Sequence, residues 1–162
     1  MNDICIGSFR MDDHQGVVEL ILSIQRREFG IDISIEDQPD LMSIASFYQT
    51  GVGDFVVARR NGVVIGTIGL KDIGNGDAAL RKMFVAAEWR GREFHVAHQL
   101  LLYLLERAKS GGVHRIYLGT NASFLAAHRF YEKYGFELIE RHRLPARFDV
   151  MAVDSRFYTL SL

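Results

Sequence analysis

The chain has 162 residues, of which 48% are apolar and 24% charged, and its formal net charge is −1. This length predicts a single domain over residues 1–162, which can bury enough surface to fold without a disulfide or a structural metal. The near-neutral charge argues against a dedicated nucleic-acid binder, which usually carries a basic face.

No apolar run approaches the roughly 20 residues of a membrane-spanning helix, and the N-terminal residues MNDICIGSFR contain no signal-peptide pattern. Cys5 is the only cysteine, so no intramolecular disulfide can form. We therefore expect a cytoplasmic protein with neither nucleic acid nor a membrane among its partners. A homodimer is left open.

The first half of the chain predicts a short strand, two helices and a hairpin. The strand is expected near residues 4–9, and the helices cover 12–29 and about 37–49, because apolar side chains there recur at helical spacing. After these helices the apolar residues no longer recur at helical spacing. Residues 54–70 hold two β-rich runs joined by Asn61-Gly62, the strongest short-range signal for a hairpin.

The second half predicts a third antiparallel strand, a crossover helix, a parallel strand, another helix and two last strands. Their expected ranges are 78–87, 95–109, 114–120, 124–134, 136–144 and 155–162. The order β-α-α-β-β-β-α-β-α-β-β predicts an α/β (α+β) fold with a mixed, mostly antiparallel central sheet flanked by helices. Only the strands on either side of the crossover helix are expected to be parallel.

This order, with a basic turn after the fourth strand, resembles the GNAT superfamily of acyl-CoA-dependent N-acetyltransferases over nearly the whole chain. The resemblance is carried by LRKMFVAAEWRG, by VAHQLL and by AAHRFYEKYGF, the last of which is similar to the family's fourth-helix pattern. It implies that the protein transfers an acetyl group from acetyl-CoA to a primary amine by direct attack on the thioester. No metal is expected, since the six histidines show no metal-binding spacing.

The turn before the crossover helix is the expected pyrophosphate site, because a helix N-terminus offers free backbone N–H groups and a partial positive charge. Two registers of the family's loop pattern compete, one starting at Arg90 and one at Arg92. The second keeps Ala97 and leaves only His95 off pattern, where the family has glycine. The expected cradle consists of Arg90, Gly91, Arg92, His95, Val96, Ala97 and His98. A solvated, charged loop is the competing interpretation.

The resemblance also places the reacting groups. A bulge at Met83, Phe84 and Val85 is expected to free a backbone N–H for the thioester carbonyl, although these residues also suit a plain core strand. Ala127 and Tyr131 share one helix face, so the Tyr131 phenol is the expected proton donor to the departing thiolate, with a core aromatic as the alternative.

Asn121 is a candidate ligand of the pantetheine amides, although Asn also favours turns and Phe124 stands where many members have asparagine. The general base is open between Asp77, Glu28, His128 and a chain of waters.

The acceptor is expected against the first two helices and the loop near Pro145. Glu28, Asp32, Glu36, Asp37 and Asp40 there favour a cationic amine. A small amine, a peptide N-terminus and a lysine side chain all remain open.

Two other classes compete with an enzyme of this type. His95 and Phe124, both off pattern, suit a catalytically degenerate acyl-CoA-binding sensor or interaction module. A dinucleotide-binding oxidoreductase is disfavoured because the chain has no G-x-G-x-x-G motif.

Overall fold

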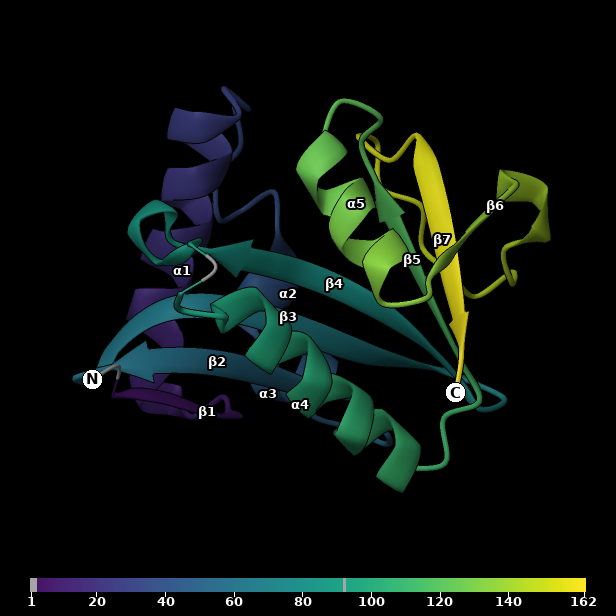
Figure 1. Ribbon diagram of the computed structural model, residues 1–162, viewed down its shortest axis with the longest axis horizontal. Helices are drawn as coiled ribbons and strands as arrows, with labels where there is room; N and C mark the ends of the chain where they lie inside the picture. Colours follow the sequence, from purple (N-terminus) through teal and green to yellow (C-terminus); the bar gives the residue numbers. More distant parts are fainter. Residues whose placement is uncertain (1–2, 92) are drawn as a thin grey trace.

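The computed structural model describes residues 3–91 and 93–162 (Figure 1). Over these residues the chain forms a seven-stranded sheet in the order β1-β2-β3-β4-β5-β7-β6. The strands are β1 (Ile4–Ser8), β2 (Asp54–Arg60), β3 (Val63–Gly74), β4 (Asp77–Val85), β5 (Arg115–Thr120), β6 (Glu137–Ile139) and β7 (Arg156–Ser161). Neighbouring strands are antiparallel except β4 and β5, which are parallel. The predicted fold class is confirmed.

Helices cover both faces of the sheet (Figure 1). On one face lie α4 (Val96–Ser110) and α5 (Leu125–Lys133), which bury Leu100, Leu104 and Tyr131 in one cluster. On the other face lie α1 (His14–Ser23), α2 (Pro39–Met42) and α3 (Ile44–Tyr48), whose apolar residues pack on Phe55 and Val57 of β2. Both helical layers form because each helix has an apolar stripe along one side, and packing that stripe on the sheet removes it from water.

The two hairpins arise from local backbone chemistry. Asn61 and Gly62 have φ of 52° and 78°, and Asn75 and Gly76 have φ of 56° and 79°. Two consecutive positive φ values are typical of the tight turns whose twist matches that of the flanking strands. The predicted Asn61-Gly62 hairpin is confirmed.

Three elements differ from the predicted ones. The helix expected over 37–49 breaks at Ser43, whose hydroxyl donates to the carbonyl of Pro39 and so competes with the helical backbone. The strand expected over 136–144 ends at Ile139, where a 3-10 turn replaces it. The first helix is regular to Ser23 and continues as a π-helical turn, Ile24–Glu28, a form that is frequent at functional sites.

The sheet opens between β4 and β5. Residues 77–79 of β4 pair with 115–117 of β5, and beyond them the two strands separate. Along its other edge, β4 keeps its pairing with β3 as far as Val85. A gap therefore forms in the middle of the sheet at the end of β4 that leads into α4.

Candidate active site

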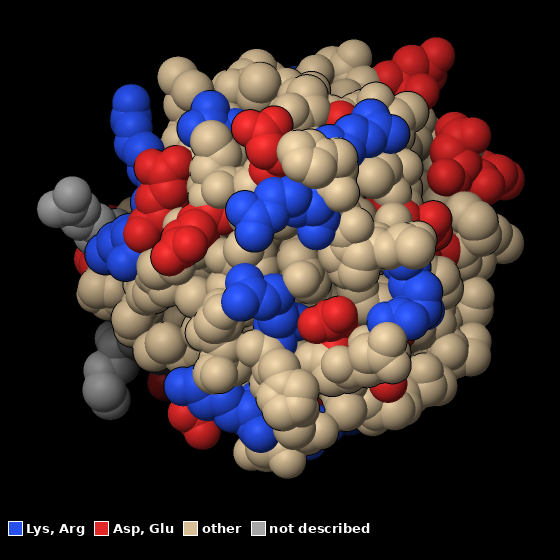
Figure 2. Space-filling view, turned by 90° about the vertical axis from the view of Figure 1, so that its right-hand side faces the viewer, with Lys and Arg blue, Asp and Glu red and all other residues tan. Residues whose placement is uncertain are grey.

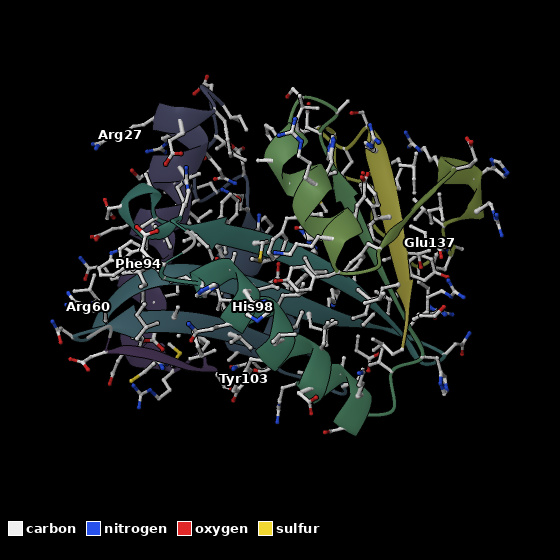
Figure 3. All side chains as sticks on the ribbon, viewed as in Figure 1. Arg27, Arg60, Phe94, His98, Tyr103 and Glu137 are labelled. Atoms are coloured by element: carbon white, nitrogen blue, oxygen red, sulfur yellow. The ribbon has the colours of Figure 1, made fainter. Side chains whose placement is uncertain are left out.

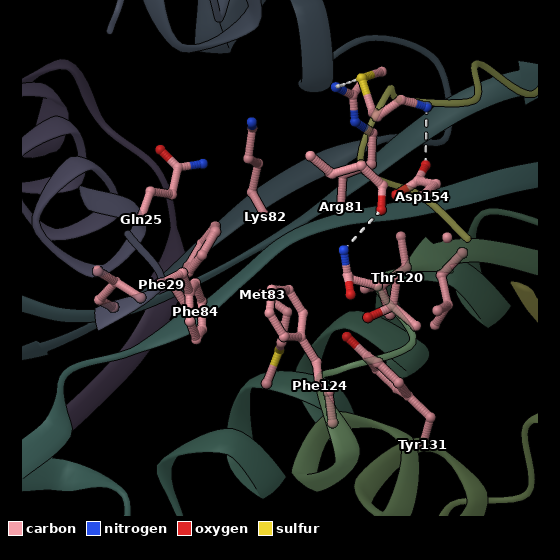
Figure 4. Close-up of a pocket in the computed structure, with 18 of the residues that line it drawn as sticks. Gln25, Phe29, Arg81, Lys82, Met83, Phe84, Thr120, Phe124, Tyr131 and Asp154 are labelled. Carbon is pink, nitrogen blue, oxygen red and sulfur yellow. Dashed lines mark hydrogen bonds between the residues drawn. The ribbon is translucent and has the colours of Figure 1, made fainter. Parts of the chain in front are cut away.

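A cavity of about 870 Å³ occupies the gap between β4 and β5 (Figure 4). Its wall includes Gln25, Glu28 and Phe29 from the π-helical end of the first helix, and Ala127 and Tyr131 from α5. These two helices cover opposite faces of the sheet, so the cavity passes through the sheet. Two reactants can therefore meet in it from opposite sides.

The cavity brings together about half of the site residues expected from the sequence. Met83, Phe84, Val85, Arg90, Asn121, Ala127 and Tyr131 line it. Gly91, in the loop before α4, lies outside its lining, as do His95, Val96, Ala97 and His98 around the first turn of that helix. Arg92 falls outside the described residues.

A β-bulge interrupts β4 beside this cavity. Thr67 faces Phe84 and Gly69 faces Arg81, so Lys82 and Met83 together oppose the single residue Ile68. Lys82 adopts a φ of 55°, the left-handed conformation that glycine usually supplies at such bulges. The buried hydroxyl of Thr67 donates to the Lys82 carbonyl at 2.7 Å, which stabilises a carbonyl displaced from the regular ladder.

Tyr131 is buried, and its hydroxyl points toward the cavity (Figure 4). The hydroxyls of Tyr134 and Tyr158 bind His98 and Glu132, whereas that of Tyr131 has no hydrogen-bond partner among the described residues. Burial raises the pKa of the Tyr131 phenol well above its ordinary value, so the phenol is protonated at neutral pH. It can therefore donate a proton to a group in the cavity.

The first turn of α4 has the form of an anion site. His95, the residue before the helix, is exposed and has φ 54° and ψ 27°. Glycine adopts this left-handed conformation without strain, and His95 stands at a small-residue position of the family's loop pattern in either register. The backbone N–H groups of Val96, Ala97 and His98 have no acceptor within the helix and remain available.

The side chains around this turn are engaged with protein groups. The Arg90 guanidinium donates to both carboxylate oxygens of Glu28, at 2.6 and 3.0 Å, and to the Val85 carbonyl at 2.7 Å. His98, labelled on α4 in Figure 3, contacts the Tyr134 hydroxyl through Nδ1. In this structure the backbone of α4, more than these side chains, is free for a phosphate.

Asn121 makes a local turn. Its side-chain oxygen accepts from the backbone N–H and the hydroxyl of Ser123, and its amide donates to the Val153 carbonyl. Next to it, Phe124 stacks on Phe29, with ring centroids 4.5 Å apart. The off-pattern Phe124 thus joins the two helical layers across the cavity.

Of the candidate general bases, only Glu28 lines the cavity, and its carboxylate is paired with Arg90. Asp77 lies at the opposite end of β4 from the bulge. His128 binds the Asn121 carbonyl through Nε2 and is buried outside the lining.

Asp154, in the loop before β7, lines the cavity and was not expected from the sequence. Its carboxylate packs against Gly119 of β5 and accepts from the Met151 N–H at 2.9 Å. Burial raises the pKa of Asp154, the effect being opposed by the Met151 N–H and by nearby Arg81, Arg141 and Lys82. A carboxylate whose pKa is raised in a cleft is a candidate proton acceptor.

Of the acidic residues that suggested a cationic acceptor, only Glu28 lines the cavity, and its carboxylate is paired with Arg90. Asp32, Glu36 and Asp37 are absent from the lining of the cavity, and Asp40 is buried and bound to the Tyr48 hydroxyl at 2.5 Å. The strand residues Arg81 and Lys82 line it instead. The two adjacent cations in LRKMFVAA were a visible signal, but strand alternation would place them on opposite faces.

Within residues 3–91 and 93–162, no three His, Cys, Asp or Glu side chains are arranged to hold a metal ion. No helix in the same part of the chain is long and apolar enough to cross a bilayer. Figure 2 shows Lys and Arg interspersed with Asp and Glu on one face of the molecule. On that face an anion would be met by local groups, not by a continuous basic surface.

Comparisons with known proteins agree with this geometry. Residues 18–136 match the acetyltransferase (GNAT) family. A GNAT-family acetyltransferase from Staphylococcus aureus Mu50 is 37% identical with a TM-score of 0.92, each chain covered to 98%. An acetyltransferase from Streptococcus agalactiae 2603 is 29% identical with a TM-score of 0.94, each chain covered fully.

A curated relative, the N-acetylaspartate synthetase of Xenopus tropicalis, is 34% identical over 113 residues, which are 65% of this chain and 40% of that protein. The chain thus spans less than half the length of this relative. The PaiA N-acetyltransferase of Thermoplasma acidophilum, solved with coenzyme A, shares the fold with a TM-score of 0.73 at 19% identity. With the family match over most of the chain, these findings show that the chain belongs to the acetyltransferase (GNAT) family.

Proposed function

We infer that the protein transfers an acetyl group from acetyl-CoA to a primary amine by direct attack, within one domain that spans residues 1–162. The observation that carries this proposal is the cavity through the opened sheet, because it exposes both the β4 bulge and the Tyr131 phenol. Acetyl-CoA enters from the α4–α5 face and the amine from the α1–α3 face. Acetyl-CoA supplies the thioester that the amine attacks.

Each group has a separate task. The free N–H groups at the start of α4 hold the pyrophosphate. A backbone N–H freed at the bulge stabilises the negative charge that develops on the thioester oxygen, a contribution commonly worth about 3–4 kcal/mol. Asp154 accepts the proton that the amine must lose, and Tyr131 donates a proton to the departing thiolate.

A catalytically degenerate acyl-CoA-binding sensor is the second candidate. It is favoured by Phe124, which stacks on Phe29 across the cavity, and by Arg90, whose charge is neutralised by Glu28. A sensor needs the cofactor-binding face but does not need Asp154 and Tyr131 in the same cavity.

The deciding experiment measures thiol release from acetyl-CoA against a panel of amines, with calorimetric titration of CoA alongside. Turnover that depends on both substrates, and acetylated amine detected by mass spectrometry, supports the enzyme. CoA binding without acetyl transfer to any amine supports the sensor.

A further inference from the structure

Two consecutive cations of β4 turn to the same side of the sheet. In a regular strand Arg81 and Lys82 would face opposite ways, but the bulge lets both reach the layer formed by α2 and α3. The Arg81 guanidinium lies over the Phe47 ring and 3.9 Å from Asp40, and the Lys82 ammonium lies 3.8 Å from the same carboxylate. Both residues line the cavity beside the bulge (Figure 4).

The protein only partly satisfies these cations. Arg81 and Lys82 side chains are 15% and 13% exposed, so each has lost much of its water. Asp40 is the one carboxylate within 4 Å of either among the described residues, and it also accepts from the Tyr48 hydroxyl. Within the part of the chain that the structure describes, the Arg81 side chain donates one hydrogen bond, to the Met151 sulfur at 3.7 Å, which is a weak acceptor.

Lys82 is better satisfied, because its ammonium donates to the Gln38 side chain at 2.6 Å. The other carboxylate nearby, Asp154, is held by the Met151 N–H and forms no ion pair with either cation. A guanidinium with five donors is therefore largely buried against one shared carboxylate. Burial of such a group is costly unless a further anion binds it.

We propose that the acceptor is a free amino acid whose carboxylate is bound by Arg81 with the help of Lys82. This rests on the proposed acetyl transfer. Arg81, Met83 of the bulge and Asp154 line the same cavity, so a carboxylate held by Arg81 leaves the amine on the adjacent carbon inside that cavity. A lysine side chain within a protein and the N-terminus of a peptide lack this neighbouring carboxylate, so both become poor acceptors.

The first test uses the wild-type protein and matched pairs of acceptors. Each amino acid is compared with its α-carboxamide, which keeps the side chain and the amine but removes the negative charge. We expect kcat/KM to be about 10- to 100-fold higher for the best amino acid than for its amide, the range of a charge-assisted hydrogen bond. The amine of the amide is less basic, so more of it is unprotonated and nucleophilic at neutral pH. This difference favours the amide, so a preference for the amino acid cannot arise from it.

The second test uses Arg81→Met, with Arg129→Met as the matched control, since Arg129 is exposed on α5 outside the cavity. Arg81→Met should lower kcat/KM for the amino acid about 10- to 100-fold, chiefly through KM, and leave the amide within about twofold. For the amino acid, kcat/KM of Arg81→Lys should lie between the values of the wild type and Arg81→Met, because lysine keeps the charge but lacks the planar guanidinium. Melting curves establish that each variant is folded.

A third measurement separates this inference from the proposed function. Calorimetry of the CoA-saturated wild-type protein reports amino-acid binding without turnover. Binding of amino acids but not of amides supports the carboxylate site even if no acetyl group moves, whereas the absence of transfer to any amine overturns only the enzyme. Amides that are acetylated as well as, or better than, the amino acids overturn the inference and leave the enzyme intact. If Arg81→Met folds but impairs both substrates equally, Arg81 is structural and the inference is wrong.

Discussion

Two residues in the cavity, the buried Tyr131 and the half-buried Asp154, hold their protons more tightly than they would in water. Burial raises the pKa of both the Tyr131 phenol and the Asp154 carboxyl, because each group is charged only in its deprotonated form. For the phenol this keeps a proton ready for donation. For the carboxyl it strengthens the base that accepts a proton from the amine. The same physical effect therefore keeps the phenol protonated and makes the carboxylate a stronger base.

Tyr131→Phe should lower turnover about 100-fold or more while changing CoA affinity little, because it removes only the proposed proton donor. The melting temperature should not fall, since the Tyr131 hydroxyl has no hydrogen-bond partner among the described residues. Tyr117→Phe, on β5 outside the cavity lining, is the control. Steady-state thiol release and calorimetry check the result, and undiminished turnover would make Tyr131 a core residue.

Asp154→Asn should abolish most turnover and raise stability at neutral pH. The folded-state pKa is raised, so the stabilisation linked to this carboxyl is present below the unfolded value near 3.8 and is lost as pH rises through the folded pKa. Asn removes that loss, so its advantage in melting temperature should vanish in acid. In the pH profile of kcat/KM, protonation of this carboxyl should lower activity with a midpoint above pH 3.8. This decrease should be absent from the variant.

Asp32→Asn is the control, because Asp32 is exposed and absent from the cavity lining. If Asp154→Asn keeps both the wild-type rate and this decrease in activity at low pH, another group accepts the proton.

At the scale of single elements, irregular backbone marks the site. The bulge in β4, the π-helical turn after α1 and the left-handed residue before α4 all border the reaction path. Lys82 and His95 adopt positive φ although they are not glycine. Each such residue costs of the order of 1–3 kcal/mol, which the surrounding structure must offset.

Thr67→Val tests the bulge. Removing the hydroxyl leaves the Lys82 carbonyl without this donor, which should cost about 1–3 kcal/mol and lower turnover about tenfold as the bulge relaxes. Thr159→Val is a matched control, because the buried Thr159 hydroxyl donates in the same way to the Ile116 carbonyl. It should lose similar stability and keep its turnover per folded molecule. Equal turnover in both variants would separate the bulge from catalysis.

His95→Gly tests the first turn of α4. Glycine relieves the left-handed strain, worth about 1–2 kcal/mol, so the melting temperature should rise and CoA binding should be retained or tightened. Asn61→Gly, at another positive φ in the turn between β2 and β3, should change stability without affecting CoA. Loss of CoA binding in His95→Gly would show that the imidazole is a specific ligand.

At the scale of the whole molecule, the opened sheet is held by contacts between layers. The Phe29–Phe124 stack and the Arg90–Glu28 ion pair both span the cavity region. Neither replaces the missing strand pairing between β4 and β5, so a ligand in the gap should stabilise the entire fold.

CoA at about 100 times its dissociation constant should stabilise the protein by about 2.7 kcal/mol, a rise of roughly 5–10 °C in melting temperature for a chain of this size. Differential scanning fluorimetry over a range of CoA concentrations measures the effect, with free phosphate as the control ligand. An unchanged melting temperature at saturating CoA would contradict the placement of the cofactor in the sheet.

What the sequence determined by itself is local. Asn61-Gly62 specifies a hairpin through the φ angles of two adjacent residues, and the apolar spacing over 96–108 specifies the buried face of α4. The sequence predicted that Tyr131 and Ala127 share one helix face, because one helical turn separates them. The family resemblance predicted that this face lies at the cofactor site.

Tertiary structure alone decided what meets in the cavity. Arg90 pairs with Glu28, 62 positions away, and Asp154 faces β4 from a loop about 70 residues later, distances over which no periodicity carries information. Arg81 and Lys82 share one side only because β3 and β4 differ in length by a residue at the bulge. Chain-distant contacts and a one-residue register shift are properties of the folded sheet, so the charge of the acceptor site became visible only there.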